Sequence, residues 1–452
     1  MTSITRRTAL RGAAATLAAP MIVPSSVFGK AAPSNRVTIG AIGVGRISRI
    51  HDMKEIHKHA DAQIVAVCDL DTVRLGAGMQ LVDSRYSEGR DKPYAGTRGY
   101  TDYRELLAAK DIDAVLISTP DHQHAPMAVH AVQAGKHVYC QKPASLTIAE
   151  GRRMADAVKA SGMILQIGSQ QRGQDPWPQF HRACELVRNG RIGKLVHVEV
   201  GLPGDPSGPA APAMPIPRNL DYDAWLGTTP EVYYTEMRVH PQNSFEDRPG
   251  WLRCEQFGAG MITGWGAHHV DTAHWGMDME HSGPVEIWGT AAFPQSGLWD
   301  VHGPFESHAR YANGVTMTIS GAFETGVKFV GDKGWIFVTR TGQVSASDPS
   351  KPADVPLRAS DPRILDSVIG PNEIHLYKAP EQHRNWLDAI RTGAAVSAPA
   401  EIGHRACSTC LLHWIAMKTG RRIRWDPVAE TIIGDPEAAA MLSRPQRSRY
   451  AI

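Results

Sequence analysis

The chain has 452 residues, of which 42% are hydrophobic, and a formal net charge of +2 at pH 7. A chain of this length and composition can bury the cores of two or three domains. The small net charge and the absence of a long Lys/Arg block argue against nucleic acid as the main partner.

The first 32 residues have the pattern of an export signal. A twin-arginine pair, Arg6 and Arg7, precedes an alanine-rich apolar run at 12–23 and a small-residue region at 24–32. The apolar run is too short for a stable membrane span, and a disordered basic tail is the alternative interpretation. The pattern predicts a periplasmic or otherwise exported protein, carried already folded by the twin-arginine route.

From residue 36 onwards, apolar strand-like runs alternate with helix-like segments. The strand-like runs are 37–42, 63–68, 114–118, 137–140 and 163–167. The helix-like segments are 47–59, 72–86, 103–109, 125–134 and 148–160. Continuous apolar strands separated by helices are typical of a parallel sheet covered on both faces. We therefore expect a doubly wound α/β domain at 34–162.

The pattern changes after about residue 175. The segment 203–217 is rich in Pro, Gly and Ala, which is typical of a surface excursion. Strand-like runs joined by glycine-containing turns follow at 285–293, 308–320, 326–330 and 334–339, and two late helices are expected at 383–392 and 402–418. These elements predict a second domain at 163–452 that contains an antiparallel sheet.

Two cysteines, Cys407 and Cys410, form a CxxC pattern inside the last of these helices. Such a pattern could be a redox pair or half of a metal site. Because no second CxxC follows and both thiols would lie on one apolar helix face, we expect them to pack in the core.

A glycine-rich turn follows the first strand and opens the first helix. Gly43 would allow the tight turn, and Gly45 would let the backbone approach a pyrophosphate at the helix N-terminus, next to Arg46 and Ile47. Ser48 replaces the third glycine of the usual motif but is small enough for close helix packing. The turn predicts the dinucleotide site of a Rossmann domain, and an ordinary glycine turn is the alternative.

An acidic residue at the end of the second strand bears on which dinucleotide binds. Asp69 can accept hydrogen bonds from a ribose 2′-hydroxyl and would repel a 2′-phosphate. We therefore expect NAD, although Arg74 could favour NADP instead.

Polar residues also follow the later strands, where ligands of an open parallel sheet collect. Lys142 could hydrogen-bond a substrate hydroxyl and stabilise the alkoxide that develops as hydride leaves; a solvated lysine at the sheet edge is the alternative. The further residues that we expect to contact the cofactor, in addition to Lys142, are Ser118, Thr119, Pro120, His124 and Gln141.

The segment 264–275 is the densest polar and aromatic cluster in the sequence. On a helix, Asp271 shares a face with His268 and could hold one tautomer of that histidine and raise its basicity. His268 is then the candidate general base. A metal site with His268, Asp271 and His274 as ligands and a structural histidine cluster are the alternatives. We expect no metal, because His268 and His274 point in different directions on one helix.

From residue 36 to the C-terminus, the sequence resembles the Gfo/Idh/MocA oxidoreductases, a family named for glucose-fructose oxidoreductase and inositol dehydrogenase. The resemblance lies in GVGRIS, STPDHQHAPMAVHAVQAGKHVYCQKP and GMITGWGAHHVD. It implies a Rossmann domain followed by an α/β domain with a large, open, mostly antiparallel sheet. Because that sheet often mediates oligomers in the family, we expect a homo-oligomer.

The resemblance also implies roles for single residues. The family's Glu-Lys-Pro motif falls on 141–143, which makes Lys142 the catalytic lysine, and its Asp-x-x-x-His pair falls on Gly264 and His268. Gln141 and Gly264 depart from these motifs, so the proton chemistry depends on Lys142 and His268, with His269 or Asp271 compensating.

The implied activity is an NAD(P)-dependent oxidation of a hydroxyl on a sugar or sugar-derived polyol. An exported enzyme meets no substantial nicotinamide pool, so the cofactor is expected to stay bound between turnovers. The alternatives are a redox-neutral glycosidase-like or epimerase-like enzyme that oxidises its substrate transiently, and a non-catalytic sugar-binding protein. The residues expected to contact the substrate are Lys142, Arg172, Trp265, His268, His269 and Asp271.

Overall fold

The computed structural model describes residues 35–340 and 355–452. The predicted export signal at 1–32 lies outside these residues. Among the helices of the described ranges, none combines the length and the apolar character that a membrane span requires.

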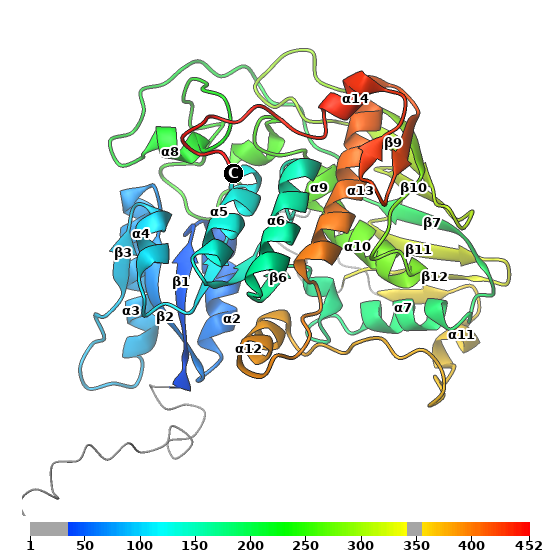
Figure 1. Ribbon diagram of the computed structural model, residues 1–452, viewed down its shortest axis with the longest axis horizontal. Coiled ribbons are helices and arrows are strands. Elements are labelled where there is room, and N and C mark those ends of the chain that lie inside the picture. Colours follow the sequence, from blue (N-terminus) through cyan, green and yellow to red (C-terminus); the bar gives the residue numbers. More distant parts are fainter. Residues whose placement is uncertain (1–34, 341–354) are drawn as a thin grey trace, which may run out of the picture.

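The first domain is built on a six-stranded parallel sheet in the order β3-β2-β1-β4-β5-β6 (Figure 1). Its strands are β1 (Val37–Ile42), β2 (Ala62–Cys68), β3 (Arg98–Tyr100), β4 (Ala114–Ile117), β5 (His137–Cys140) and β6 (Leu165–Ile167). Its helical segments are the π-helical turn η3 (Ser48–Asp52), α2 (Met53–His57), α3 (Thr72–Ser87), α4 (Tyr103–Ala108), α5 (Asp121–Gln133) and α6 (Ile148–Ser161). The predicted doubly wound parallel sheet is confirmed, and β6 joins it just beyond the boundary expected at 162.

The register of this sheet aligns the carboxyl ends of its central strands. Ile42 pairs with both Cys68 and Ile117, and Ile117 pairs with Cys140. All four side chains are buried. The polar residues that directly follow these strand ends therefore lie side by side along one edge. The strand order reverses between β1 and β4, and ligands of such sheets bind in the crevice at that point.

The second domain contains a nine-stranded sheet in the order β13-β12-β11-β7-β10-β9-β8-β14-β15. It is mostly antiparallel, as predicted, with one parallel pair between β7 and β10. Its strands are β7 (Leu195–Gly201), β8 (Glu286–Ala291), β9 (Phe305–Arg310), β10 (Thr316–Ser320), β11 (Gly326–Gly331), β12 (Trp335–Val338), β13 (Leu357–Ala359), β14 (Ile423–Asp426) and β15 (Thr431–Ile432). The single strand expected at 308–320 is in fact part of β9 and all of β10, because a turn at Gly314, with φ +86°, separates them.

The second part of the chain also contains helices, some of which pack between the two sheets. They are η4 (Gln170–Arg172), α7 (Gln179–Arg188), α8 (Tyr222–Leu226), η5 (Gly250–Arg253), α9 (Met261–Gly264), α10 (Gly266–Met277), α11 (Pro362–Asp366), α12 (Gln382–Thr392), α13 (Ala400–Thr419) and α14 (Pro436–Ala440). The long helix α13 packs against α6 of the first domain and α10 of the second (Figure 1), and also against β8. Cys407 and Cys410 in α13 are buried and unpaired, as core packing predicts. This packing holds α10 beside the carboxyl edge of the parallel sheet.

Candidate active site

A cavity of about 800 Å³ opens at the carboxyl edge of the parallel sheet and extends to the start of α10. All the residues predicted to bind the cofactor line it: Gly43, Gly45, Arg46, Ile47, Asp69, Ser118, Thr119, Pro120, His124, Gln141 and Lys142. Trp265 and His268, two of the predicted substrate residues, line the same cavity. The fold therefore brings the candidate nucleotide turn and the candidate catalytic groups to one space.

The glycine turn has the shape that a dinucleotide requires. Gly43 has φ +83°, and a Cβ atom there would lie 2.9 Å from the carbonyl oxygen of Ser118, so a larger residue would be strained. A Cβ atom at Gly45 would meet nothing within 4 Å, which leaves its backbone open to a ligand. The Asp69 carboxylate holds the turn, because it accepts hydrogen bonds from the backbone N–H of Val44 (2.7 Å) and of Asp71 (2.9 Å). These residues fit a dinucleotide.

Arg74, the residue that could favour NADP, is tied to the loop that covers the cavity. Its Nη2 donates to the carbonyl oxygens of Pro241 (2.8 Å) and Ser244 (3.0 Å). Its guanidinium also lies over the Phe245 ring, 5.0 Å from the centroid. Both Arg74 and Asp69 line the cavity, so a cation and a carboxylate face the same end of it.

The side chain of Lys142 lines the cavity where the two domains meet. Its Nζ donates a 2.8 Å hydrogen bond to the carbonyl oxygen of Gly264. Burial lowers the pKa of Lys142 to about 8, although the charge of Asp121 opposes this shift. Where the family's motif has an aspartate at position 264, a main-chain carbonyl of this chain therefore accepts the lysine's hydrogen bond.

Asp121, which was not among the predicted site residues, is a second titratable group that acts on Lys142. It is the first residue of α5, it is 5% exposed, and it lines the cavity. Burial raises the pKa of Asp121 to about 7, against the opposing charges of Lys142 and Arg248. In the sequence, Asp121 is one of several polar residues that follow β4. Only the folded structure shows that its carboxyl is buried in the same cavity as Lys142.

His268 lines the cavity, but it lacks the partner that the helix spacing predicted. Its Nδ1 makes no hydrogen bond to any described residue. Burial and the charges of Arg340 and Lys142 hold the pKa of His268 well below its usual range. Asp271 does not contact His268 through its carboxylate, which instead accepts two hydrogen bonds from Arg172, at 2.7 and 2.8 Å. The predicted Asp271–His268 pair is therefore wrong, because a guanidinium offers that carboxylate a stronger, bidentate partner.

Three residues predicted to contact the substrate do not line the cavity, contrary to the prediction: Arg172, His269 and Asp271. Arg172 is 3% exposed and binds Asp271, Glu280 (2.6 Å) and the carbonyl of Ser397 (3.3 Å). The Nδ1 of His269 lies 3.1 Å from the carbonyl oxygen of Gly201 in β7. Arg172 thus ties η4 to α10 through Asp271, and His269 ties α10 to β7.

The same contacts bear on the metal alternative for this helix. His274 Nε2 lies 2.9 Å from the hydroxyl of Tyr311, and Asp271 is paired with Arg172. His268, Asp271 and His274 therefore have separate surroundings and do not form a ligand set.

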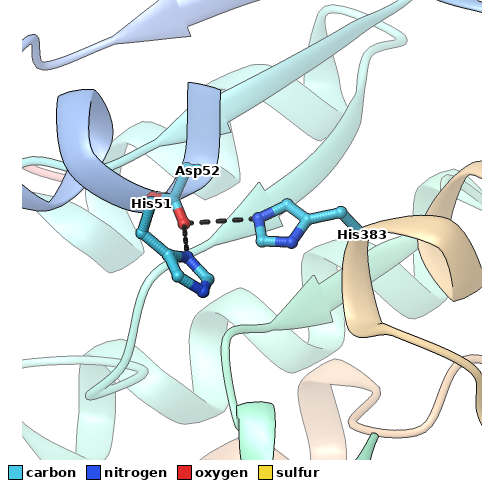
Figure 2. A group of neighbouring side chains, drawn as sticks. All are labelled: His51, Asp52 and His383. Carbon is cyan, nitrogen blue, oxygen red and sulfur yellow. Dashed lines mark hydrogen bonds and ion pairs between the residues drawn. The ribbon is translucent and has the colours of Figure 1, made fainter. Parts of the chain in front are cut away.

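An ionic network centred on the buried Asp52 borders the cavity and includes His51 and His383 (Figure 2). Asp52 is fully buried and accepts hydrogen bonds from Ser118 Oγ (2.7 Å) and Gln141 Nε2 (2.8 Å). Ser118 donates to Oδ2 of this carboxylate, and Gln141 donates to Oδ1. His51 Nδ1 and His383 Nε2 lie 3.0 and 3.3 Å from the same Oδ1. The family's motif has a glutamate where this chain has Gln141. Because the amide is neutral and donates a hydrogen bond, the Asp52 carboxylate can lie beside it without charge repulsion.

These three residues, His51, Asp52 and His383, form the one group of described metal-ligating side chains whose ligand atoms lie within 4.8 Å of one another. The other nitrogen of His383, Nδ1, lies 2.7 Å from Glu381 Oε1. Burial alone would lower the pKa of His383, but the charges of Glu381 and Asp52 outweigh it and raise the pKa to about 9. A protonated His383 can therefore donate from both ring nitrogens, to Asp52 and to Glu381.

The raised pKa of His383 makes a prediction for stability against pH. A cationic histidine with a pKa of about 9 in the folded protein, above the usual 6.5, stabilises fully below pH 6.5 and ceases to do so as the pH rises through 9. We expect urea midpoints of the wild type to fall between pH 6.5 and 9.5 more steeply than those of His383→Gln. Equal slopes for the two proteins would contradict the assignment.

The fold and the cavity define a two-domain protein with a Rossmann dinucleotide site that opens toward a mixed-sheet domain. Residues 37–169 match the family model described as the NAD-binding Rossmann fold of the GFO_IDH_MocA oxidoreductases. Residues 208–348 and 369–452 match the model of the family's C-terminal alpha/beta domain. Together the two models cover more than half of the chain, which belongs to the Gfo/Idh/MocA oxidoreductase family.

The chain is similar to parts of several curated proteins. It is 29% identical over 208 residues to a glycosyl hydrolase family 109 protein of Stenotrophomonas maltophilia (strain K279a), a match that covers 45% of this chain and 43% of that protein. It is 31% identical over 160 residues to the uncharacterized oxidoreductase YrbE of Bacillus subtilis (strain 168), covering 35% of this chain and 42% of that protein. The chain therefore spans less than half the length of these relatives.

Solved structures resemble the whole fold at low sequence identity. The WlbA dehydrogenase from Bordetella pertussis, in complex with NADH and UDP-GlcNAcA, has a TM-score of 0.61 at 18% identity. The aldose-aldose oxidoreductase from Caulobacter crescentus, complexed with glycerol, has a TM-score of 0.58 at 18% identity. Each match covers 86% of this chain and 99% of the other. At these identities the likeness establishes the fold.

Proposed function

We propose that this protein is an NAD(P)-dependent oxidoreductase that acts on a hydroxyl of a sugar or sugar-derived polyol. The observation that carries the proposal is that a single cavity is lined by the glycine turn, Asp69, Lys142 and His268. The structural neighbours that hold NADH with a UDP-sugar, or glycerol, support a polyhydroxylated substrate.

The cofactor would lie along the carboxyl edge of the parallel sheet, with its phosphates at Gly45 and its ribose near Asp69. When bound, a nicotinamide dinucleotide supplies the acceptor for a hydride. The Asp69 carboxylate favours NAD over NADP, because it would repel a 2′-phosphate. We expect the cofactor to stay bound between turnovers, since the proposed location outside the cytoplasm offers no pool for exchange.

This chain's own residues would bind and orient the sugar. The amine of Lys142, with a pKa of about 8, is partly neutral just above neutral pH and can take the proton of a substrate hydroxyl. His268 stays neutral, because its pKa is held well below its usual range, so it offers a ring nitrogen for a hydrogen bond. Trp265 would pack its ring against the apolar face of the sugar.

A second candidate function uses the same residues in a redox-neutral reaction. Here the substrate is oxidised and reduced again within one turnover. The transient carbonyl acidifies a neighbouring C–H bond, loss of that proton expels the glycosidic oxygen as the alcohol, and water adds in its place before the hydride returns. The similarity to glycosyl hydrolase family 109 proteins favours this candidate. A tightly retained cofactor fits it as well, because the cycle needs no external acceptor.

Export through the twin-arginine route and homo-oligomer formation complete the proposal. The twin-arginine pattern at the start of the chain supports the first. The nine-stranded sheet supports the second, since the family often uses such a sheet for assembly.

The first test is mass spectrometry of small molecules released by denaturing the protein after purification without added nucleotide. We expect about one dinucleotide per chain. The same preparation is then incubated with p-nitrophenyl glycosides without an acceptor. Release of p-nitrophenol without NADH accumulation supports the redox-neutral reaction, and NADH accumulation supports the dehydrogenase. A protein that neither retains nor binds a dinucleotide would contradict both.

A further inference from the structure

A buried carboxylate without a hydrogen-bond partner among the described residues lines the same cavity as Lys142. Asp121 is 5% exposed, yet its side chain makes no hydrogen bond or ion pair with another described residue. Buried carboxylates normally have hydrogen-bond or ionic partners, because desolvating an unpaired charge is costly. A structural role would show such partners, as it does for Asp52 and Asp271. The oxygens of Asp121, which accept no hydrogen bond from another described residue, can instead accept one from a ligand.

Two cations face this carboxyl, and they come from different elements. Lys142 follows β5, and Arg248 lies on the loop between α8 and η5; both line the same cavity. Lys142 itself is held by one hydrogen bond to a main-chain carbonyl. Arg340 and Arg248 also act on Lys142 and oppose its positive charge. Asp121 is therefore the acidic group that favours the protonated form of the lysine.

We infer that Asp121 is a catalytic residue, and that Asp121 and Lys142 together take up the proton that leaves the substrate hydroxyl. This inference rests on the proposed function. The O–H bond breaks and its proton passes to the Asp121–Lys142 pair. The oxygen's electron pair forms the carbonyl as the hydrogen on carbon leaves with its bonding pair to the oxidised dinucleotide. In the reverse direction the same pair returns the proton.

The proton affinities of the two groups support a shared proton. Burial raises the pKa of Asp121 to about 7 and lowers that of Lys142 to about 8. Because burial moves the two pKa values toward each other, the two groups titrate as a pair. His268, by contrast, has a pKa well below its usual range, with burial as the main cause. His268 would therefore be too weak a base to take up the substrate proton at neutral pH.

One test measures the pair without any turnover. The rate at which an acylating reagent modifies Lys142 is followed against pH by peptide mass spectrometry, which reports the pKa of the amine. Removing a neighbouring negative charge disfavours the ammonium form, so Asp121→Asn should shift this profile to lower pH. Asp247→Asn, which neutralises another acid of the cavity lining, should leave the profile in place. An unshifted profile in Asp121→Asn would overturn the inference, whether or not a substrate has been found.

The second test uses a p-nitrophenyl glycoside that the wild type turns over. We expect turnover of the wild type to rise with pH between about 6 and 8, as the pair loses its proton. Asp121→Asn should lower turnover by about 10²–10⁴-fold and move or remove this rise, while thermal unfolding and bound dinucleotide stay near wild type. His268→Gln should keep the rise and mainly increase KM. Loss of the rise in His268→Gln, with Asp121→Asn unaffected, would assign the proton to His268 and contradict the inference.

Discussion

Lys142→Ala should lower turnover by about 10²–10⁴-fold, the range expected for loss of a general acid–base group. The amine lies at the cavity wall with a pKa of about 8, where it can exchange a proton near neutral pH. The retained dinucleotide should persist, because the glycine turn and Asp69 do not depend on this side chain. Turnover and released dinucleotide are measured on the same preparation.

A second buried lysine provides the control. Lys136 is 7% exposed and donates to the carbonyl oxygens of Ala109 and Ile112, both at 2.8 Å, outside the cavity lining. Lys136→Met should therefore leave turnover per folded molecule unchanged. If Lys142→Ala retained wild-type turnover, the proposed chemistry would be wrong. If no substrate were turned over by either protein while a sugar still bound, the non-catalytic alternative would be favoured.

Arg172→Met should cost about 3–5 kcal/mol of unfolding free energy, the loss typical of breaking a buried ion pair on one side. Arg172 is 3% exposed and pairs with Asp271, which is 1% exposed, and with Glu280. Its guanidinium also lies 5.0 Å from the centroid of the Trp275 ring. The substitution leaves the Asp271 carboxylate without its cation in a site that water barely reaches, while Glu280 keeps only a longer contact with Arg188 at 3.8 Å. Urea unfolding at constant pH measures the effect.

An exposed pair on the same chain is the matched control. Arg363 and Asp361 form an ion pair at the start of α11, and the Arg363 side chain is 89% exposed. Exposed pairs contribute little, because water screens them and the side chains lose freedom when they pair. Arg363→Met should therefore not shift the urea midpoint measurably. An equal, small shift in both variants would show that the Arg172 cluster does not stabilise the fold.

Local sequence patterns predicted the parallel sheet well. The strand expected at 37–42 coincides with β1, and the helix expected at 148–160 coincides with α6 to within one residue. The strand β1 is buried on both faces, so its apolar run is continuous in the sequence. The helix α6 ends at Gly162, which is a clear stop signal. β7 was not predicted, because His197 and Glu199 alternate with its apolar residues on a face that is only partly buried.

The candidate site was predicted only in part. The glycine turn, Asp69 and Lys142 could be placed from sequence, because parallel strands all end at one edge of their sheet. The Asp271–His268 pair could not, since helix spacing says nothing of Arg172, which approaches from 99 residues away in the chain. Asp121 was visible as a residue, but its importance arises from burial beside Lys142, and burial is a property of the folded chain.

The amino-acid sequence by itself determined the Rossmann sheet, the turn that suits a dinucleotide, and a lysine at the edge where ligands bind. These features depend on periodicity and on neighbouring residues, which a linear chain carries. Only the tertiary structure decided which carboxylate faces Lys142, which residues face the cavity, and that Asp52 meets His383 from 331 positions away. Proton affinities and ion pairs depend on desolvation and on charges brought together by folding, so no local pattern contains them.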